Sequence, residues 1–239
     1  MSEQSTKSAA VLGVLLFLGL AGLGYFVADG ARAVKGMERV VTVKGLSEME
    51  VPADVVIWPI VFQIADNDLN ALYSIIETTN HTIEEFLAEN GVEESDISGS
   101  TPTVSDLYAN NYGDKSNIKF RYTARSAVTV YSKNIQEVRK AMANVVELGK
   151  QGIAVTGNQY GDQTQFLFTD LNSLKPKMIE EATANARAVA EKFAADSNSK
   201  LGKIRSARQG QFSINDRDTS TPHIKNVRVV STIEYYLTD

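Results

Sequence analysis

The sequence predicts an α+β protein in which helices pack on one face of antiparallel sheet, preceded by one transmembrane helix. Residues 9–28 form an uninterrupted run of apolar or small side chains, long enough to cross a bilayer. Several later segments alternate apolar and polar residues with a period of two, which is typical of half-buried strands. Three further segments have helical periodicity and are separated by groups of adjacent strands. This order favours α+β architecture over strictly alternating strands and helices.

The composition excludes several classes of protein. The 239 residues include 24 Lys plus Arg, 29 Asp plus Glu, two His and no Cys, for a formal net charge of −5. Without cysteine there is no disulfide scaffold, thiolate nucleophile, iron–sulfur cluster or cysteine-ligated zinc site. Two histidines do not make a His-rich metal centre. The acidic balance, with no concentrated Lys/Arg face, argues against nucleic acid as a partner.

The N-terminal run predicts a membrane anchor. Residues 1–8 form a short tail, residues 9–28 the transmembrane helix, and residues 29–38 a polar linker. Twenty helical residues span roughly 30 Å, the thickness of the hydrocarbon core of a bilayer. The partner expected for residues 9–28 is therefore the lipid bilayer.

A cleaved signal peptide is the alternative, with the small-residue site at 31–33. The run exceeds the roughly 7–15 residues of a signal h-region and has a thin positive n-region, which favours an uncleaved anchor. Lys and Arg flanking the run slightly favour a cytoplasmic C-terminal domain, but a long translocated domain crosses largely regardless of charge.

Two strands and a helix are predicted next. Residues 39–44 and 55–64 are rich in β-branched residues, with a break expected at Gly45 and around Pro52. Pro59 cannot donate to a ladder, which places it at an edge or a bulge. The helix is expected over 66–90, with an apolar stripe of Leu69, Leu72, Tyr73, Ile76, Ile83, Phe86 and Leu87.

Capping residues are expected at both ends of this helix. Asp66 or Asn67 is suited to its N-cap, and Gly91 to a left-handed position after its end. Residues 97–107 read as extended and are interrupted by Pro102. The stretch 109–117 has turn composition.

A long half-buried strand is predicted over 119–131, followed by a helix over 135–148. We expect this strand to present an edge to a partner. Residues 165–168 read as a further strand. Strand 55–64 with helix 66–90, and strand 119–131 with helix 135–148, are compatible with two related strand–helix–strand units.

The last third predicts one helix and two strands. The helix covers 174–196, with Ser173 as N-cap, Pro176 in its first turn, and an apolar line of Met178, Ala182, Ala186, Val189 and Phe193. Its many alanines would let it lie close to a sheet. A strand over 203–212, a polar loop over 213–222 and a strand over 227–237 complete the fold. The aromatic residues expected in the core are Trp58, Tyr122, Tyr131, Tyr235 and Tyr236.

Four segments in this order resemble the SIMPL-domain family, the YggE-like envelope proteins of bacteria. They are VVTVKGLSEMEVPADVVIWPIVF at 40–62, GVEESDISGSTPTVSDLY at 91–108, FRYTARSAVTVYSKNIQEVRKAM at 120–142 and EEATANARAVAEKFAADSNSKLGKI at 180–204. The resemblance implies that residues 39–239 form an extracytoplasmic SIMPL-like α+β domain. It also implies protection of the envelope under oxidative or other stress, and homo-oligomers. It supplies no catalytic residues.

The residues themselves give no enzyme motif. The glycines at 152–163 lack the Gly-Lys-Ser/Thr ending of a phosphate-binding loop. His81 has no second ligand one helical turn away, and His223 follows Pro222 in a loop. We therefore expect no catalytic, cofactor-binding or metal-binding residues.

Two functions remain when this absence of motifs is combined with what the resemblance implies. The first is a non-enzymatic, self-assembling envelope protein anchored in the inner membrane by a single span, with its C-terminal domain in the periplasm. The same domain would be a secreted periplasmic protein if the segment is cleaved. The alternative is an extracytoplasmic binding module for a lipid or small apolar ligand, which requires an apolar pocket of roughly 300–1,000 Å³.

Overall fold

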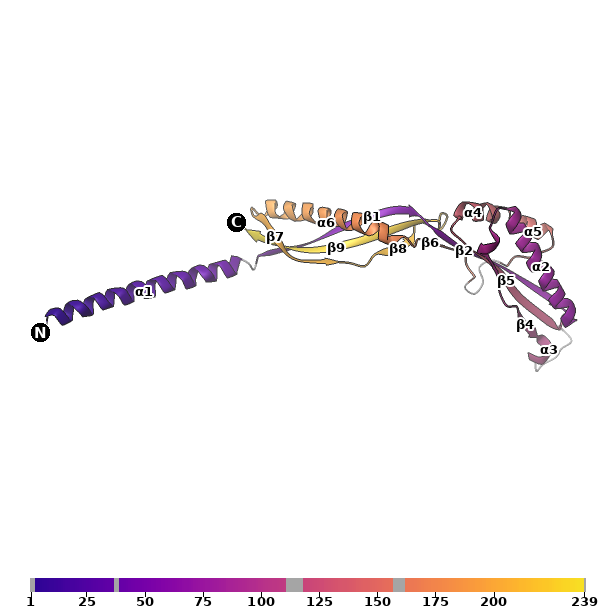
Figure 1. The fold of residues 1–239 in the computed structure, drawn as a ribbon, viewed down its shortest axis with the longest axis horizontal. Helices are drawn as coiled ribbons and strands as arrows, with labels where there is room; N and C mark the ends of the chain where they lie inside the picture. Colours follow the sequence, from indigo (N-terminus) through magenta and orange to yellow (C-terminus); the bar gives the residue numbers. More distant parts are fainter. Residues whose placement is uncertain (1–2, 37–38, 111–117, 157–161, 239) are drawn as a thin grey trace. The chain divides into compact units, whose positions relative to one another are not determined.

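A computed structural model describes residues 3–36, 39–110, 118–156 and 162–238 of the chain (Figure 1). The described segments form two compact units. Unit 1 comprises residues 1–49, 175–213 and 228–239, and unit 2 comprises residues 50–174 and 214–227. Each unit combines antiparallel sheet with helices, so the predicted α+β class is confirmed.

The N-terminal helix α1 extends from Glu3 to Gly36. It contains the predicted apolar run and continues beyond it, so residues 29–36 are helical and not a linker of irregular structure. Ala31, Arg32 and Ala33, which suggested a cleavage site, all lie within this helix.

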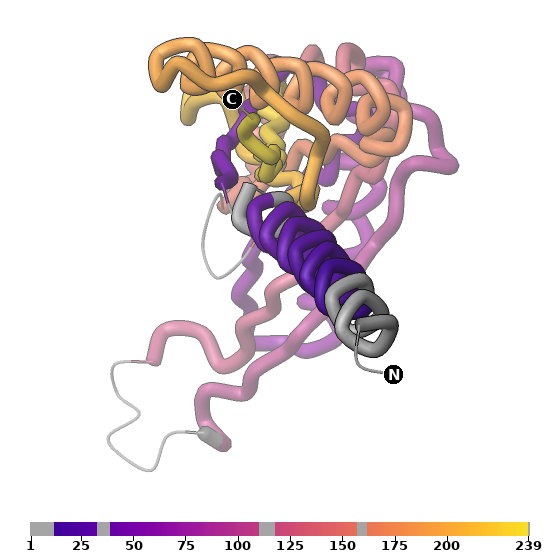
Figure 2. The backbone as a smooth tube through the Cα atoms, turned by 90° about the vertical axis from the view of Figure 1, so that its left-hand side faces the viewer, coloured from indigo at the N-terminus to yellow at the C-terminus, as the bar shows by residue number. Residues whose placement is uncertain are grey.

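Unit 1 is built on a sheet with strand order β1-β9-β7, in which β8 also pairs with β9. The strands are β1 (Val40–Pro52), β7 (Lys200–Gln209), β8 (Ser213–Asp216) and β9 (Ile224–Thr238). Helix α6 (Leu171–Asp196), orange in Figure 2, lies along the yellow β9, and Ala186 and Ala190 pack against Ile233 and Tyr235.

The break predicted at Gly45 is wrong, because β1 continues through it to Pro52. Gly45 allows a close approach of strand and helix. A Cβ atom built on Gly45 would lie 1.8 Å from the carbonyl oxygen of Ala182 and 2.5 Å from the backbone nitrogen of Ala186. The glycine thus lets β1 lie directly on the backbone of α6.

The face that α6 buries differs from the predicted one in its second half. The buried residues recur every four positions and are Met178, Ala182, Ala186, Ala190 and Ala194. Val189 and Phe193 were expected on this face, but they are 41% and 57% exposed. Because the helix lies so close to the sheet, only small side chains fit between them, and the larger Val189 and Phe193 lie on the solvent side.

The start of α6 also differs from the prediction. The helix begins at Leu171, three residues before the expected position, so Pro176 lies inside it. Ser173 is not its N-cap, because its hydroxyl donates to the carbonyl of Asp170 at 2.8 Å. The carboxylate of Asp54 accepts hydrogen bonds from the backbone amides of Thr169 and Asp170 at 2.8–2.9 Å and fixes the chain before the helix.

The region after α6 contains more strand than predicted. β7 ends at Gln209 and has irregularities on either side of Ile204. Residues 213–216 of the expected loop form β8. The strand predicted over 227–237 is confirmed as β9 and begins three residues earlier.

Unit 2 is built on a second sheet with strand order β3-β5-β2-β6, in which β4 also pairs with β5. The strands are β2 (Val55–Asp66), β3 (Ile97–Gly99), β4 (Thr103–Asp106), β5 (Tyr122–Ser132) and β6 (Gln165–Leu167). β2 and β5 pair antiparallel without interruption from Val56↔Ser132 to Asp66↔Tyr122.

The prediction that the strand at 119–131 presents an edge is wrong. β5 lies between β2 on one side and β3 and β4 on the other, so its backbone is paired on both sides. Pro59, in contrast, lies at a local edge as predicted. β6 pairs only with residues 55–57 of β2 and leaves the side of Pro59 away from β5 without a strand partner in the described residues.

Helix α2 (Leu69–Glu89) packs against β2 and β5. Its N-cap is Asp68, whose carboxylate accepts from the amides of Asn70 and Ala71, and not Asp66 or Asn67. Asp66 is still part of β2. Leu69 and Tyr73 were expected to be buried and are exposed, whereas Gly91 has the predicted left-handed conformation, with φ of 84°.

The helix predicted over 135–148 is divided into α4 (Ile135–Ala143) and α5 (Val146–Lys150). At the break, Asn144 donates from its side chain to Oδ1 of Asn90 at 2.7 Å. This division exposes Val146 and buries Leu148. Shorter helical turns are η1 (Glu94–Asp96) and α3 (Leu107–Asn110), and most of the loop predicted over 109–117 lies outside the described residues.

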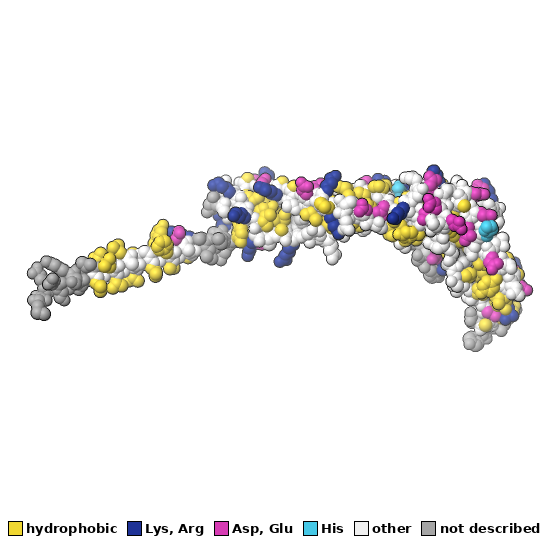
Figure 3. Space-filling model, viewed as in Figure 1, with side chains coloured by type: hydrophobic (Ala, Val, Ile, Leu, Met, Phe, Trp, Pro, Cys, Tyr) yellow, Lys and Arg dark blue, Asp and Glu magenta, His cyan; other side chains and the backbone are white. Residues whose placement is uncertain are grey.

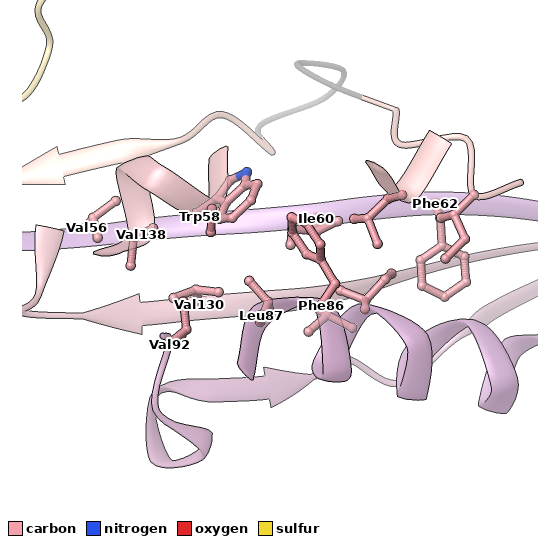
Figure 4. Packing of buried hydrophobic residues seen from close by; sticks show 14 of the residues in the cluster. Val56, Trp58, Ile60, Phe62, Phe86, Leu87, Val92, Val130 and Val138 are labelled. Carbon is pink, nitrogen blue, oxygen red and sulfur yellow. The ribbon is translucent and has the colours of Figure 1, made fainter. Parts of the chain in front are cut away.

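The core of unit 2 lies between its sheet and its helices (Figure 4). Alternate residues of β2 face α2 and α4, and the buried set includes Val56, Trp58, Ile60, Phe62, Phe86, Leu87, Val130 and Val138. Of the aromatic residues predicted to be buried, Tyr131 is 53% exposed because it alternates with the buried Val130.

Candidate functional site

The largest exposed apolar surface described is that of α1. The 21 residues from Leu12 to Arg32 are long and apolar enough to cross a membrane, and none of this segment is buried. A helix of this length rises about 31 Å, which matches the hydrocarbon core of a bilayer. Figure 3 shows its hydrophobic side chains in yellow around the helix. The helix is compatible with membrane insertion, and a signal sequence would have the same properties.

His81 lies on the exposed side of α2 in unit 2. Its Nε2 atom is 3.1 Å from Oε1 of Glu85, one helical turn later. The two side chains line a hollow of about 460 Å³, whose other lining residues are Glu84, Ala88, Glu94 and Ile97. Its acidic side chains suit a polar or cationic group more than an apolar ligand.

His223 lies apart from this hollow, in the loop before β9. Its ring packs edge-on against Phe166, with centroids 6.0 Å apart, and its carbonyl accepts from the amide of Ala53 at 2.8 Å. Partial burial lowers the pKa of the imidazole, and the nearby charges of Arg139 and Arg217 lower it further. This environment favours the neutral ring.

Sequence reasoning missed a polar cluster in the loop between β8 and β9. Asp218 accepts hydrogen bonds from the amides of Ser220 and Thr221 at 2.8 and 2.7 Å, and it pairs with Arg217 at 3.0 Å. Hydrogen bonds from the Thr221 hydroxyl and from Arg217 hold the pKa of Asp218 well below its ordinary value. An Asp followed two or three residues later by Ser or Thr is the sequence signal for such a turn.

The same hairpin contains a buried charge. Lys225 on β9 is 6% exposed and forms an ion pair with Asp216 of β8. Among the residues that the structure describes, Lys225 is the one charged side chain that is buried. Its partner Asp216 is 50% exposed, so the ion pair reaches the surface at its carboxylate end. The pair joins adjacent strands, which is a structural role.

A second ion pair joins β4 to the start of β5. Arg121 donates to Oδ2 of Asp106 through Nε at 3.1 Å and Nη2 at 2.9 Å, and its guanidinium lies over the ring of Tyr122. The hydrogen bond from Arg121 lowers the pKa of the Asp106 carboxyl, and the same contact raises the pKa of Arg121. Both groups therefore stay charged.

These contacts explain the local structure of unit 2. Across the described ranges, no group of three His, Cys, Asp or Glu side chains has a geometry that could hold a metal ion. The two predicted candidates, His81 and His223, contact a carboxylate and an aromatic ring respectively.

The comparison with protein-family models identifies the fold that carries these features. The model named SIMPL, described as a protein of unknown function (DUF541), matches residues 41–230, which is most of the chain. The chain belongs to the SIMPL family. The resemblance predicted from the four sequence segments is thereby confirmed. The SIMPL match begins after α1, covers the whole sheet of unit 2, and includes the sheet of unit 1 up to Val230 within β9. No curated protein matches the chain.

Proposed function

We propose that this SIMPL protein is a non-enzymatic envelope protein, anchored in the inner membrane by α1 with its α+β body in the periplasm. The observation that carries the proposal is an exposed helix of bilayer length directly before the SIMPL body. Because no described cluster joins an acid, a base and a nucleophile, we infer that the body works by contact with other molecules and contributes to protection against oxidative or envelope stress.

The side of the membrane on which the body lies can be tested with an introduced cysteine. The chain has no native cysteine, so Ala184→Cys on the exposed side of α6 gives one unique thiol. We expect a membrane-impermeant maleimide to label this thiol in intact spheroplasts. Labelling only after lysis would place the body in the cytoplasm and contradict the proposal.

Self-assembly is proposed through the edge of β1 that has no strand partner among the described residues. The carbonyl of Leu46 in this strand accepts a hydrogen bond from Asn185 of α6 at 2.9 Å. This strand ends the order β1-β9-β7 and is 13 residues long. At the opposite side, β7 carries Lys200, Lys203 and Arg205 and is irregular near Ile204, which are features that discourage edge pairing. A strand of a second copy is therefore better accommodated by β1 than by β7.

Mass photometry of the detergent-solubilised full chain tests this assembly. We expect a discrete species larger than one chain per micelle, and Leu46→Lys on the exposed face of β1 should reduce its mass. Ile204→Lys on β7 is the matched control, since it introduces the same charge at an exposed apolar residue of the other side. A single monomeric species at micromolar concentration would contradict self-assembly.

The stress role has its own test. A host strain lacking this gene should lose viability under peroxide or envelope-disrupting treatment, and the full chain should restore it. Equal survival of the two strains would contradict the protective role.

The alternative function, binding of an apolar ligand, is less well supported because the hollow at His81 is bordered by three glutamates.

A further inference from the structure

Unit 1 differs in charge from unit 2. Unit 1 contains 14 Lys and Arg against 10 Asp and Glu, whereas unit 2 contains 10 against 19. The acidic character of the chain therefore belongs entirely to unit 2. In Figure 3, dark-blue side chains are frequent over α6 and β7, and magenta ones over α2.

Hydrogen bonds locate the start of the unit 1 sheet relative to α6. The guanidinium of Arg39 donates to the hydroxyl of Ser199 at 2.8 Å, just after α6 ends. The carbonyl of Arg39 accepts from the amide of Leu237, and Leu201 pairs with Leu237 in the sheet. The end of α6, the start of β7 and the end of β9 thus meet at Arg39.

The chain length between α1 and Arg39 limits how far this end can lie from a bilayer. The apolar window ends at Arg32, and the helix continues for four residues to Gly36. Four helical residues rise about 6 Å, and the three further residues to Arg39 span at most about 11 Å. The polar headgroup region adds roughly 5–7 Å on each side of the hydrocarbon core. Residues around Arg39 are therefore within about 20 Å of the headgroups.

This end presents exposed cationic and aromatic side chains. Lys192, Lys200 and Lys203 are all exposed, and Phe193 is 57% exposed on the last turns of α6. The carboxylate of Asp196 lies 3.4 Å from Lys192 and compensates part of its charge, and Lys200 also has an interaction partner. Basic side chains close to a membrane are attracted to anionic lipid, and an aromatic ring beside them can enter the interface.

We propose that this end of unit 1, comprising Lys192, Phe193, Lys200 and Lys203, docks on the surface of an anionic phospholipid bilayer. The docking rests on the proposed membrane insertion of α1, which holds these residues near the lipid. Its occupant is the phospholipid headgroup layer, because positive charge and an exposed aromatic ring occur together at the end that the chain length keeps close to it. The contact restrains the body relative to the membrane.

The experiment uses the full chain in nanodiscs that contain headgroup spin-labelled lipid. A fluorophore on Ala195→Cys reports on the proposed surface, and the same fluorophore on Ala184→Cys is the control about 16 Å away along the same helix. We expect at least twofold stronger quenching at position 195 than at 184 in discs that contain phosphatidylglycerol. The difference should decrease in phosphatidylcholine alone and at raised salt.

Charge substitutions separate docking from simple proximity. The double variant Lys192→Gln with Lys203→Gln should dock less. Each substitution should lower the ratio of docked to undocked protein by about fivefold. Lys133→Gln with Lys177→Gln changes the net charge equally at exposed residues elsewhere and should have no effect. Phe193→Ser should lower quenching in discs of either composition, whereas Val146→Ser should not.

The outcomes distinguish the docking from the anchoring. Equal quenching at positions 184 and 195, or quenching that neither lipid charge nor the lysine substitutions alter, overturns the docking while the chain remains in the disc. Loss of the chain from the discs would overturn the membrane anchoring, and the docking with it.

Discussion

Gly45 shows how one residue determines the packing of unit 1. Its α-carbon lies so close to α6 that a methyl group has no space, since the obstructing atoms belong to the helix backbone. Movement of a flexible side chain cannot relieve this contact. The helix presents alanines every four residues at the same surface, so both elements have small side chains where they meet.

We predict that Gly45→Ala destabilises the protein by more than about 4 kcal/mol, because strand and helix must separate. Gly99→Ala in β3 is the control, since a Cβ atom there has no neighbour within 4 Å. Its effect should be within about 0.5 kcal/mol. Urea unfolding followed by circular dichroism measures both. Equal midpoints for the two variants would show that the close contact does not limit stability.

His223 predicts a dependence of stability on pH. Its pKa in the folded protein is lowered by burial and by Arg139 and Arg217, with Asp218 acting in the opposite direction. The unfolded chain, with a histidine pKa near 6.5, binds the proton more readily. The contribution of His223 to stability is therefore fully present above about pH 6.5, and it decreases as the pH falls below that value.

In the His223→Gln variant, stability should decline less as the pH falls. The slope of its unfolding free energy against pH should differ from that of the wild type by less than one proton taken up on unfolding. The measurement is the midpoint of urea unfolding at a series of pH values between 7.5 and 5. This interval covers the ordinary titration range of histidine. Identical pH profiles for wild type and His223→Gln would exclude His223 as the cause.

At the scale of single elements, the start of α2 depends on one side chain. Asp68 bonds two amides of the first turn, whereas Asn67 instead accepts from the amide of Arg121 and holds the start of β5. The three polar residues before the helix thus have separate roles.

We expect Asp68→Ala to cost about 1 kcal/mol of stability, as is usual for loss of an N-cap. Glu77→Ala, at an exposed position within the same helix, should change stability by less than about 0.5 kcal/mol. Thermal unfolding of the two variants provides the comparison. A larger loss in Glu77→Ala than in Asp68→Ala would contradict the assigned cap.

Helix α1 gives a second prediction at this scale. Leu20 lies within the apolar window and is exposed. Leu20→Arg places a charge near the middle of the span, at a cost of roughly 2.5–3.5 kcal/mol for insertion. We predict that a larger share of this variant is released by alkaline carbonate than of the wild type. Leu46→Arg, outside the helix, should remain in the membrane fraction as the wild type does.

The elements that were predicted correctly are those with a strong local pattern. Alternation identified β5, β-branched composition identified β2, and helical periodicity identified α2 and α6. The differences arise from contacts distant in sequence. Gly45 resembles a turn residue in isolation, and only the backbone of α6 explains its place inside a strand. Asn144 interrupts a regular helical pattern where its side chain meets Asn90.

The pairing of strands was less predictable than their positions. Alternation along β5 shows that one face is buried, but it does not reveal whether the backbone has one neighbour or two. The polar cluster around Asp218 was missed because its residues have ordinary loop composition, and the ion pair of Lys225 because a single lysine in a strand gives no signal of burial.

At the scale of the whole molecule, an apolar helix of bilayer length precedes a SIMPL body whose two units differ in charge. Unit 1, which includes the helix, is the basic one, and unit 2 is strongly acidic. The positive charge of unit 1 favours the proposed contact with anionic lipid.

The most direct test of the account is the intact mass of the protein extracted from membranes that have been washed with alkaline carbonate. An uncleaved, integrated α1 predicts recovery in the pellet at the full mass of 26.1 kDa. Recovery in the soluble fraction, at a mass that lacks the residues before position 34, would contradict the anchored protein proposed above.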